Sequence, residues 1–323
     1  MKFRPRGSFL NLVGLIAAWL LIFGFFSWRV PGSFPTLINL QTLARQGTLD
    51  AAAALGATFI IISAGIDLSV GSLIAFVSVA IAIGLRMGYS PGVAVIAGFV
   101  LGPAWGLVNG LLITKLRVGP FIITLGTMLA IRGAAKGIAS EQSVYPPHST
   151  WMNTMLEAVP KSRSWEILPW GVWAVLVCAI LMSVVLRYTR FGRHVVAIGS
   201  NEHAARLCGV PVDRVKILVY VLGGLFGAAA GMCQFSRLEM GDPTSAFGEE
   251  LNIIAAVVIG GASLSGGQGS IAGSLLGVLI MVTIASGATQ MGLPDWVQQV
   301  VTGAIIVLAV ALDQVRLRAT KSA

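Results

Sequence analysis

The chain has few charged side chains for its length. Asp, Glu, Lys and Arg make up 11% of its 323 residues, whereas hydrophobic residues make up 56% and the mean hydropathy is +0.85. Soluble domains carry roughly 25% charged residues, and a soluble core cannot bury this much apolar surface. The composition therefore excludes an ordinary soluble domain and predicts a protein embedded in a lipid bilayer.

Cysteine is scarce, and the sequence motif of a nucleotide-binding loop is absent. Cys178, Cys208 and Cys233 are odd in number and far apart, which argues against a disulfide framework or a metal site. No G-x-x-x-x-G-K-[ST] run occurs, so this polypeptide does not hold ATP in a P-loop. No nucleophile, metal cluster or carboxylate pair has catalytic spacing. We therefore expect no cofactor, no bound metal and no enzymatic activity in this chain.

Long apolar runs dominate what remains. A bilayer core about 30 Å thick needs roughly 20 apolar residues per helix, and only helices or closed barrels satisfy their backbone groups in lipid. The sequence thus predicts an all-α polytopic membrane protein, with residues 1–323 forming a single transmembrane domain of about ten helices. The expected helices are 9–28, 47–64, 68–86, 91–114, 119–138, 168–187, 215–235, 248–264, 270–288 and 296–312.

The basic residues indicate topology and not nucleic-acid binding. The formal net charge is +9, but most Lys and Arg lie in short segments between apolar runs, as the positive-inside rule describes. The pattern places both termini in the cytoplasm, with 9–28 as a retained first helix and not a cleaved signal peptide. Two connections are long: a cytoplasmic loop at about 188–215 and a periplasmic loop at about 140–168.

Two apolar runs are interrupted by similar Gly- and Ser-rich segments, Ile62 to Ser72 and Ile259 to Ser270. Paired interruptions in two halves of a membrane protein indicate a transport pathway; chance similarity between Gly-rich membrane segments is the alternative. The candidate pathway residues are Gly65, Asp67, Ser69, Gly71, Asn109, Gly260, Gly261, Ser263, Ser265 and Gly267.

Polar residues within these runs have structural explanations beside the functional ones. Asp67 either caps a helix beginning at about Leu68 or caps it and also lines the solute path. Asn109 fits an interhelical hydrogen bond as well as solute contact. Asp50, Glu249 and Glu250 lie at predicted helix starts, where negative charge is stabilised without a role in transport.

The cytoplasmic loop contains a candidate short helix. Ser200 or Asn201 can cap its start and Gly209 can end it. A helix of about two turns is marginal alone, so it must pack against its own chain or a partner. The face formed by Ala204 and Ala205 allows close approach by a groove, and flanking arginines can meet acidic residues or lipid headgroups. These arginines are Arg190, Arg193 and Arg206.

At this loop the chain resembles the ribose-type (monosaccharide) permease family of bacterial ABC importers, within the branched-chain/ribose permease superfamily. The shared motifs are Thr189 to Arg193, Gly199-Ser-Asn201, Ala204-Ala-Arg206, Gly65 to Ser72, Pro120 to Gly126 with Arg132-Gly133, Gly241 to Thr244, Glu250 to Gly261 and Ser263 to Gly267. They occur in the family's order across about residues 45–312.

The resemblance implies a membrane subunit without catalytic activity, driven by separate cytoplasmic ATP-binding subunits that hold ATP and Mg²⁺. A periplasmic binding protein would deliver a sugar or sugar-like solute, and a second permease subunit, identical or different, would complete the channel in the inner membrane. Residues 201–209 would be the coupling helix that docks into the ATPase. The implied coupling residues are Arg193, Asn201, Glu202, Ala204, Ala205, Arg206 and Gly209.

Two departures from the family pattern are small: Ser200 stands where relatives often have Gly, and Ser286 where they often have Asn. Pentoses, hexoses, polyols and furanone-like signals all stay open as solutes. The alternative from a different class is an ion-coupled secondary transporter, for which Asp67 is the candidate carboxylate.

Overall fold

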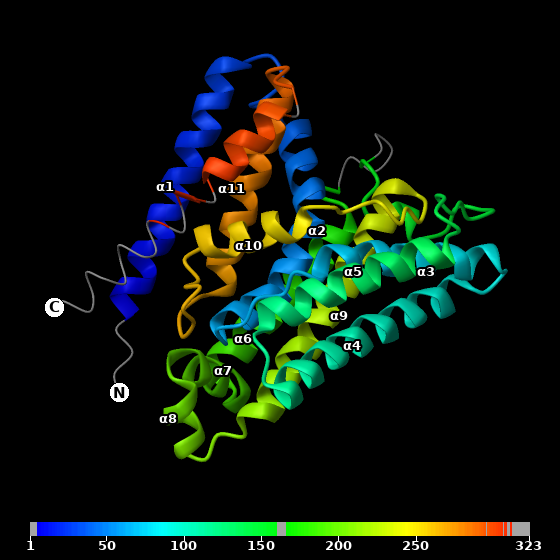
Figure 1. The fold of residues 1–323 in the computed structure, drawn as a ribbon. Helices are drawn as coiled ribbons and strands as arrows, with labels where there is room; N and C mark the ends of the chain where they lie inside the picture. Colours follow the sequence, from blue (N-terminus) through cyan, green and yellow to red (C-terminus); the bar gives the residue numbers. More distant parts are fainter. Residues whose placement is uncertain (1–4, 160–165, 295, 306, 309–310, 312–323) are drawn as a thin grey trace.

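The computed structural model describes residues 5–159, 166–294, 296–305, 307–308 and 311, and the side chains from residue 11 onward. The described chain is helical, as the sequence predicts (Figure 1). Its helices are α1 (Pro5–Arg29), α2 (Leu37–Ile62), α3 (Val70–Arg86), α4 (Pro91–Leu116), α5 (Pro120–Ile138), the 3₁₀ turn η1 (Asn153–Met155), α6 (Trp170–Tyr188), α7 (Arg190–Ser200), α8 (Glu202–Leu207), α9 (Val212–Leu238), α10 (Glu249–Ile259) and α11 (Ile271–Gln290). A further helical segment covers 296–305.

Six described helices are long and apolar enough to cross a membrane: the 11–29 part of α1, and α4, α5, α6, α9 and α11. The apolar helix α3 is shorter, and the predicted last span, 296–312, lies partly outside the described residues. Side chains such as Ile96 and Val100 on α4 and Ile180 on α6 are exposed, as expected for surfaces that face lipid. The chain is therefore a polytopic membrane protein, and the number of about ten spans stays a prediction.

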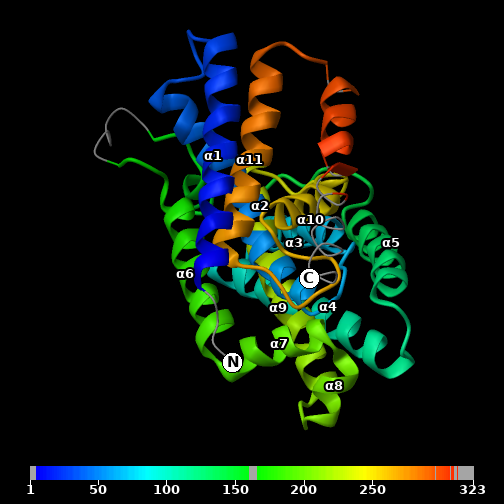
Figure 2. The same cartoon turned by 90° about the vertical axis from the view of Figure 1, so that its left-hand side faces the viewer.

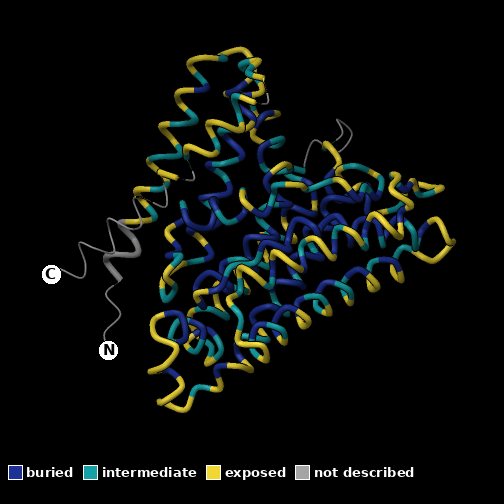
Figure 3. Tube along the Cα trace, viewed as in Figure 1, coloured by how far each residue is buried: buried dark blue, intermediate teal, exposed yellow. Residues whose placement is uncertain are grey.

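The helices form two arms that meet at a buried centre. One arm holds α1, α11 and the first part of α2, and the other holds α3, α4, α5 and α9 (Figure 1). Turned by 90°, the molecule shows α5 and α6 on opposite sides of the central helices (Figure 2). Burial is concentrated where α2, α3 and α9 pack together, and the outer turns of α1 and α4 are exposed (Figure 3). The first Gly-rich interruption, between α2 and α3, borders this centre, and the second, which contacts the end of α2, is more exposed.

The contact between α4 and α9 depends on glycine. Gly102, Gly106 and Gly110 recur at every fourth position of α4, and a Cβ atom on any of them would collide with α9 backbone. At Gly106 the colliding group is the carbonyl of Tyr220. Small residues on one face let membrane helices approach closely enough for extensive van der Waals contact. The glycine face of α4 therefore fixes the position of α9, and α9 forms much of the buried centre.

Gly106→Leu is expected to disrupt the α4–α9 contact, whereas Gly126→Leu should be tolerated because a Cβ at Gly126 meets nothing within 4 Å. Overpacking costs about 1–3 kcal/mol where side chains can yield, and here the obstacle is backbone. Size-exclusion chromatography of detergent-solubilised protein should show aggregation of the Gly106 variant alone. Equal monodisperse yields of both variants would contradict the proposed role of this contact.

Two predicted boundaries were wrong. Helix α2 begins at Leu37, well before position 47, so Asp50 lies inside the helix and not at its start. Thr36 caps α2 instead, with its hydroxyl accepting a hydrogen bond from the Asn39 amide. The early segment was missed because Gln41, Arg45 and Gln46 interrupt its apolar pattern. The predicted helix at 248–264 ends at Ile259, because the glycines that follow form a turn.

The connection between α5 and α6 packs against the rest of the chain where the structure describes it. Met152, Met155 and Leu156 are buried, and Val144 forms a β-bridge with Gly241, which follows α9. The Trp151 and Trp170 rings lie 5.8 Å apart. The loop is therefore packed onto the ends of the membrane helices over its described part.

Candidate functional site

The first interruption connects α2 to α3 and carries a polar chain of contacts. Asp67 Oδ1 accepts hydrogen bonds from the Ser69 amide at 2.8 Å and from the Ser69 hydroxyl at 2.6 Å. Asn109, on α4, donates its side-chain amide to Ser69 Oγ at 2.9 Å. Three predicted pathway residues thus meet at one point, and the interhelical hydrogen bond considered for Asn109 is confirmed.

The predicted capping geometry of Asp67 needs correction. Helix α3 begins at Val70 and not at about Leu68, and Ser69 occupies the N-cap position. Asp67 bonds Ser69 itself, so the carboxylate holds the turn that leads into the helix and not the first helical amides. An Asp side chain that bonds the backbone two residues ahead is an Asx turn, which also accounts for the irregular backbone here.

Glycines at this turn allow close packing of neighbouring groups. A Cβ on Gly65 would lie 2.7 Å from Tyr220 Oη, which itself donates a hydrogen bond to the Ile66 carbonyl at 3.3 Å. A Cβ on Gly71 would collide with the Glu250 carboxylate. The turn is therefore enclosed by α9 on one side and by α10 on another.

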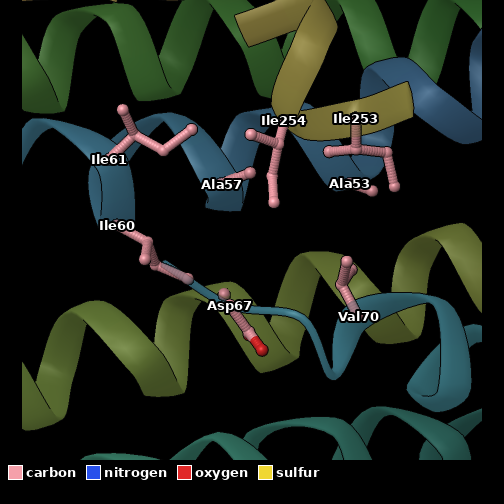
Figure 4. A pocket seen from close by; sticks show the side chains of 9 residues that line it. Ala53, Ala57, Ile60, Ile61, Asp67, Val70, Ile253 and Ile254 are labelled. Atoms are coloured by element: carbon pink, nitrogen blue, oxygen red, sulfur yellow. The ribbon is translucent and has the colours of Figure 1, made fainter. Parts of the chain in front are cut away.

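A small cavity lies between this turn and the helices α2 and α10. Ala53 and Ala57 of α2 face it together with Ile253 and Ile254 of α10, and Asp67 and Val70 lie opposite (Figure 4). Its volume is about 10 Å³, space for about one water molecule. The cavity is thus small and mainly apolar, with a carboxylate at its border.

The second interruption, 260–269, is a compact turn. Gly261, Gly266 and Gly267 have φ of 91°, 83° and 77°, which favours glycine. The Ser263 amide donates to the Gln268 carbonyl at 3.1 Å, and the Ser265 amide donates to Ser263 Oγ at 3.3 Å. A Cβ at Gly260 would collide with the Gly273 backbone of α11. The glycines therefore serve both the turn and the packing of α10 on α11.

The two interruptions touch each other and the cytoplasmic-loop helix α7. The Gly267 amide donates to the Ile62 carbonyl at the end of α2, with a distance of 2.8 Å. Gly199 of α7 lies so close that a Cβ on it would collide with the same carbonyl. A Cβ on Gly267 would likewise collide with Ser200 Oγ. These contacts define a three-way junction formed by Ile62, Gly199, Ser200 and Gly267.

Helix α7 was not predicted as a helix. Thr189 caps it by accepting from the Gly192 amide, and Val195 and Ile198 are buried while Arg193 is exposed. The spacing of Val195 and Ile198 is that of one helix face, so the periodicity was present in the sequence. Arg193 donates to the carbonyl of Tyr188 at 3.3 Å.

Helix α8 has the predicted boundaries. Asn201 caps it, with Oδ1 accepting from the Ala204 amide at 2.9 Å. Gly209, at φ 80°, follows the helix, and the amides of Gly209 and Val210 bond the carbonyls of Arg206 and Ala205. This pair of bonds is a Schellman motif, and together with the N-cap it defines a helix of 6 residues.

Ala204 and Ala205 were expected to share one face of α8, but the structure places them on different faces. Ala205 is buried against its own chain, whereas Ala204 is exposed and Leu207 is 77% exposed. The side available to another molecule therefore carries Ala204 and Leu207. Ala205 instead packs α8 onto the rest of its own chain.

Ion pairs tie α8 to the start of α9. Arg206 bonds Asp213 at 2.8 Å and lies 3.5 Å from Glu202, and Lys216 bonds Glu202 at 2.7 Å. Exposed pairs contribute little singly because water screens them, and a linked set is more effective than isolated pairs. These pairings were not foreseen, because a helical loop had to form before residues 202 and 216 could meet.

Asp67→Asn is expected to retain more transport than Asp67→Leu, because Asn Oδ1 can still accept both hydrogen bonds from Ser69 while Leu leaves these donors unpaired. An unsatisfied buried donor costs about 1–3 kcal/mol. Uptake should be normalised to the amount of inserted protein. Equal loss in both variants would instead indicate that the negative charge itself is required.

Comparisons with known proteins identify the family of this chain. Residues 39–310 match the family model described as "Branched-chain amino acid transport system / permease component". The ribose import permease protein RbsC of Bacillus subtilis is 40% identical over 87% of this chain and 86% of its own length. The chain belongs to this permease family. No solved structure matches it.

Other relatives of the permease are similar over nearly its whole length. The L-arabinose ABC transporter permease protein AraH of Azospirillum brasilense is 35% identical over 97% of this chain and 91% of its own. The xylose transport system permease protein XylH of Escherichia coli is 33% identical over 94% and 92%. The ABC permease is thereby favoured over the ion-coupled transporter considered from the sequence.

Proposed function

We propose that this permease is the membrane subunit of a bacterial ABC importer that moves a monosaccharide or a similar solute across the inner membrane. Separate cytoplasmic ATPase subunits bind ATP and Mg²⁺, a periplasmic binding protein supplies the solute, and a second permease subunit completes the channel. About ten helices cross the membrane, and both termini face the cytoplasm. The support is the family membership together with relatives named as ribose, arabinose and xylose permeases.

The observation that carries the mechanism is the three-way junction. The α7–α8 segment ends one helix at Gly199 and Ser200 and starts the next at Asn201, and the same two residues pack against Ile62 and Gly267. A force applied to α8 therefore reaches both interruptions directly. Packed backbone without intervening side chains transmits displacement because it has little room to yield.

The helix motions of the transport cycle follow from this arrangement. An ATPase that closes on nucleotide would displace α8 through the exposed side bearing Ala204 and Leu207, and Ala205 and the α8–α9 ion pairs would carry the displacement to α7 and α9. The turns at Asp67 and Ser263 would then move relative to α2 and α10, and the small cavity at Asp67 would widen. For this coupling, the permease needs only to make different contacts with the two states of its ATPase partner.

Uptake into proteoliposomes tests the proposal. The permease, reconstituted with its ATPase and binding protein, should accumulate radiolabelled ribose, arabinose or xylose only with internal ATP, and collapse of the proton and sodium gradients should have no effect. Uptake that follows an ion gradient without ATP would overturn the proposal in favour of an ion-coupled carrier. The matched control is the same vesicle with non-hydrolysable nucleotide.

A further inference from the structure

The connection between α9 and α10, residues 239–248, runs inward along α3 (Figure 1). At its start, a Cβ atom on Gly241 would lie 2.7 Å from the Cα atom of Val79. Near its end, the Ala246 carbonyl lies so close to α3 that a Cβ atom on Gly71 would collide with it. Val79 and Gly71 are about 12 Å apart along the helix, at a rise of 1.5 Å per residue. The chain therefore descends beside α3 before α10 begins.

Arg132 of α5 holds the lower part of this connection, 243–248, which we call the re-entrant segment. The guanidinium donates to the carbonyls of Pro243 at 3.0 Å, Ser245 at 2.6 Å and Ala246 at 3.5 Å. Arg132 lies about 9 Å from the end of α5, at 1.5 Å per residue, so these contacts form within the span of that helix. Charged side chains at such a depth are costly, and they face other protein groups or a water-filled cavity. The re-entrant segment is therefore held at membrane depth by a cation.

The re-entrant segment is irregular and partly exposed. Ala246 has φ of 54°, which is uncommon for a residue other than glycine. Thr244 is exposed, and the ring of Phe247 is 84% exposed. Irregular backbone at membrane depth does not face lipid, because lipid offers no partner for its polar groups; it occurs where protein covers it or where it lines a water-filled cavity. The exposed side of the segment therefore faces water or another protein chain.

The polar side chains of this connection favour water. Asp242 Oδ1 accepts hydrogen bonds from the Thr244 amide at 2.8 Å and from the Thr244 hydroxyl at 2.7 Å. A carboxylate and an exposed threonine are costly to bury without further partners. Packed contacts between membrane helices instead use small residues on regular helix faces, as the glycines of α4 do on α9. The exposed side of the re-entrant segment is thus suited to the wall of a water-filled path.

We propose that the re-entrant segment lines the solute path at the face that the second permease subunit completes, and that the ring of Phe247 contacts the solute in transit. This deepens the proposed function and rests on it for the identity of the solute as a sugar. The hydrogen bonds from Arg132 keep the segment, and with it the ring, at a fixed depth in the membrane.

An exposed phenyl ring suits a cyclic polyhydroxylated solute. Such a solute carries hydroxyls around its edge and C–H groups on its faces. The face of an aromatic ring is electronegative and attracts positively polarised hydrogen atoms. Phe247 can therefore contact the C–H face of the solute while water solvates the hydroxyls. Because no hydrogen bond is formed with the ring, the contact is weak and the solute is released onward.

Thiol accessibility tests the path without knowledge of the solute. Thr244→Cys and Phe247→Cys are made in a chain whose three native cysteines are replaced by alanine, and Val100→Cys on the exposed face of α4 is the lipid-facing control. The complete complex with its ATPase is treated with 2-aminoethyl methanethiosulfonate during ATP hydrolysis. Positions 244 and 247 should react about tenfold or more faster than position 100, because the reagent attacks a hydrated thiolate.

Reaction of both positions no faster than position 100 would show that lipid or the second subunit covers the re-entrant segment, and it would overturn the path. Fast reaction at position 244 alone would retain the path and overturn the solute contact of Phe247.

Uptake by Phe247→Ala and Phe247→Tyr tests the solute contact. The maximal rate, measured with an excess of solute-loaded binding protein, should fall about fivefold in the alanine variant, the factor that one aromatic contact contributes. The tyrosine variant retains the ring face and should stay within about twofold of the unaltered permease. Phe25→Ala, at a 50% exposed position on α1, is the matched control.

An uptake rate of Phe247→Ala equal to that of Phe25→Ala, or an equal fall in the alanine and tyrosine variants, would overturn the contact. Failure of the unaltered permease to carry ribose, arabinose or xylose would instead count against the proposed function. The labelling result would still decide whether the re-entrant segment lines a water-filled path.

Discussion

Gly199→Ala is expected to abolish solute uptake by the permease while Gly119→Ala leaves it unchanged. The added methyl group at Gly199 would collide with the Ile62 carbonyl, whereas at Gly119 it meets nothing within 4 Å. Neither helix can retreat easily, because the Gly267 amide already holds the same carbonyl at 2.8 Å. The junction must open to accommodate one carbon atom, and the turn at 260–269 must shift with it.

The size of this effect follows from its location. Overpacking of side chains typically costs about 1–3 kcal/mol of stability, and a methyl group placed against backbone costs more. The resulting strain falls on both interruptions together. We expect ATP-dependent uptake to fall about a hundredfold or more, which is about 2.7 kcal/mol or more. Substitution of Ser200, whose side chain is exposed, by Gly should be tolerated.

Three measurements on the Gly199 variant separate uncoupling from misfolding. Size-exclusion chromatography reports folding, co-purification with the ATPase reports docking, and ATP hydrolysis in proteoliposomes reports partner activity. The expected pattern is a monodisperse complex that hydrolyses ATP without moving solute. Uptake at the level of the Gly119 variant would show that the junction does not transmit motion.

The sequence was sufficient for the parts of the fold that depend on local pattern. Long apolar runs predicted α4, α5, α6, α9 and α11 to within a few residues, because bilayer thickness sets their length. The caps of α8 were predictable for a similar reason, since Asn201 and Gly209 act on backbone only a few residues away. Hydrogen bonds between residues that are close in the chain can therefore be predicted from the residue types at those positions.

What the sequence could not reveal depends on contacts between distant segments. Glu202 and Lys216 have no pattern in common, yet they bond at 2.7 Å once α8 folds back onto α9. The contact among Ile62, Gly199 and Gly267 likewise cannot be predicted from residue spacing, although each glycine stands out in the sequence. Asp50 was assigned to a helix start because polar residues concealed the first part of α2.

Leu207→Glu is expected to release the ATPase from an otherwise intact permease, while Ala205→Leu should disturb the permease itself. Leu207 is 77% exposed on α8 and Ala205 is buried beneath the same helix. An apolar side chain at the centre of a docking contact can contribute 2 kcal/mol or more, which corresponds to roughly 30-fold in affinity. A glutamate there adds the cost of burying a charge.

The contrast between these two variants identifies which side of α8 the partner occupies. Co-purification of the ATPase should be lost with Leu207→Glu at wild-type thermal stability, and the Ala205→Leu permease should unfold at lower temperature before binding is affected. Leu116→Glu, at a 58% exposed position at the end of α4 between Lys115 and Arg117, is the control for an added exposed charge. If Leu207→Glu retained the ATPase and Ala205→Leu released it without loss of stability, the partner would have to reach the inner side of α8. The helix would then detach from α9, breaking the Arg206–Asp213 and Lys216–Glu202 pairs, in order to dock.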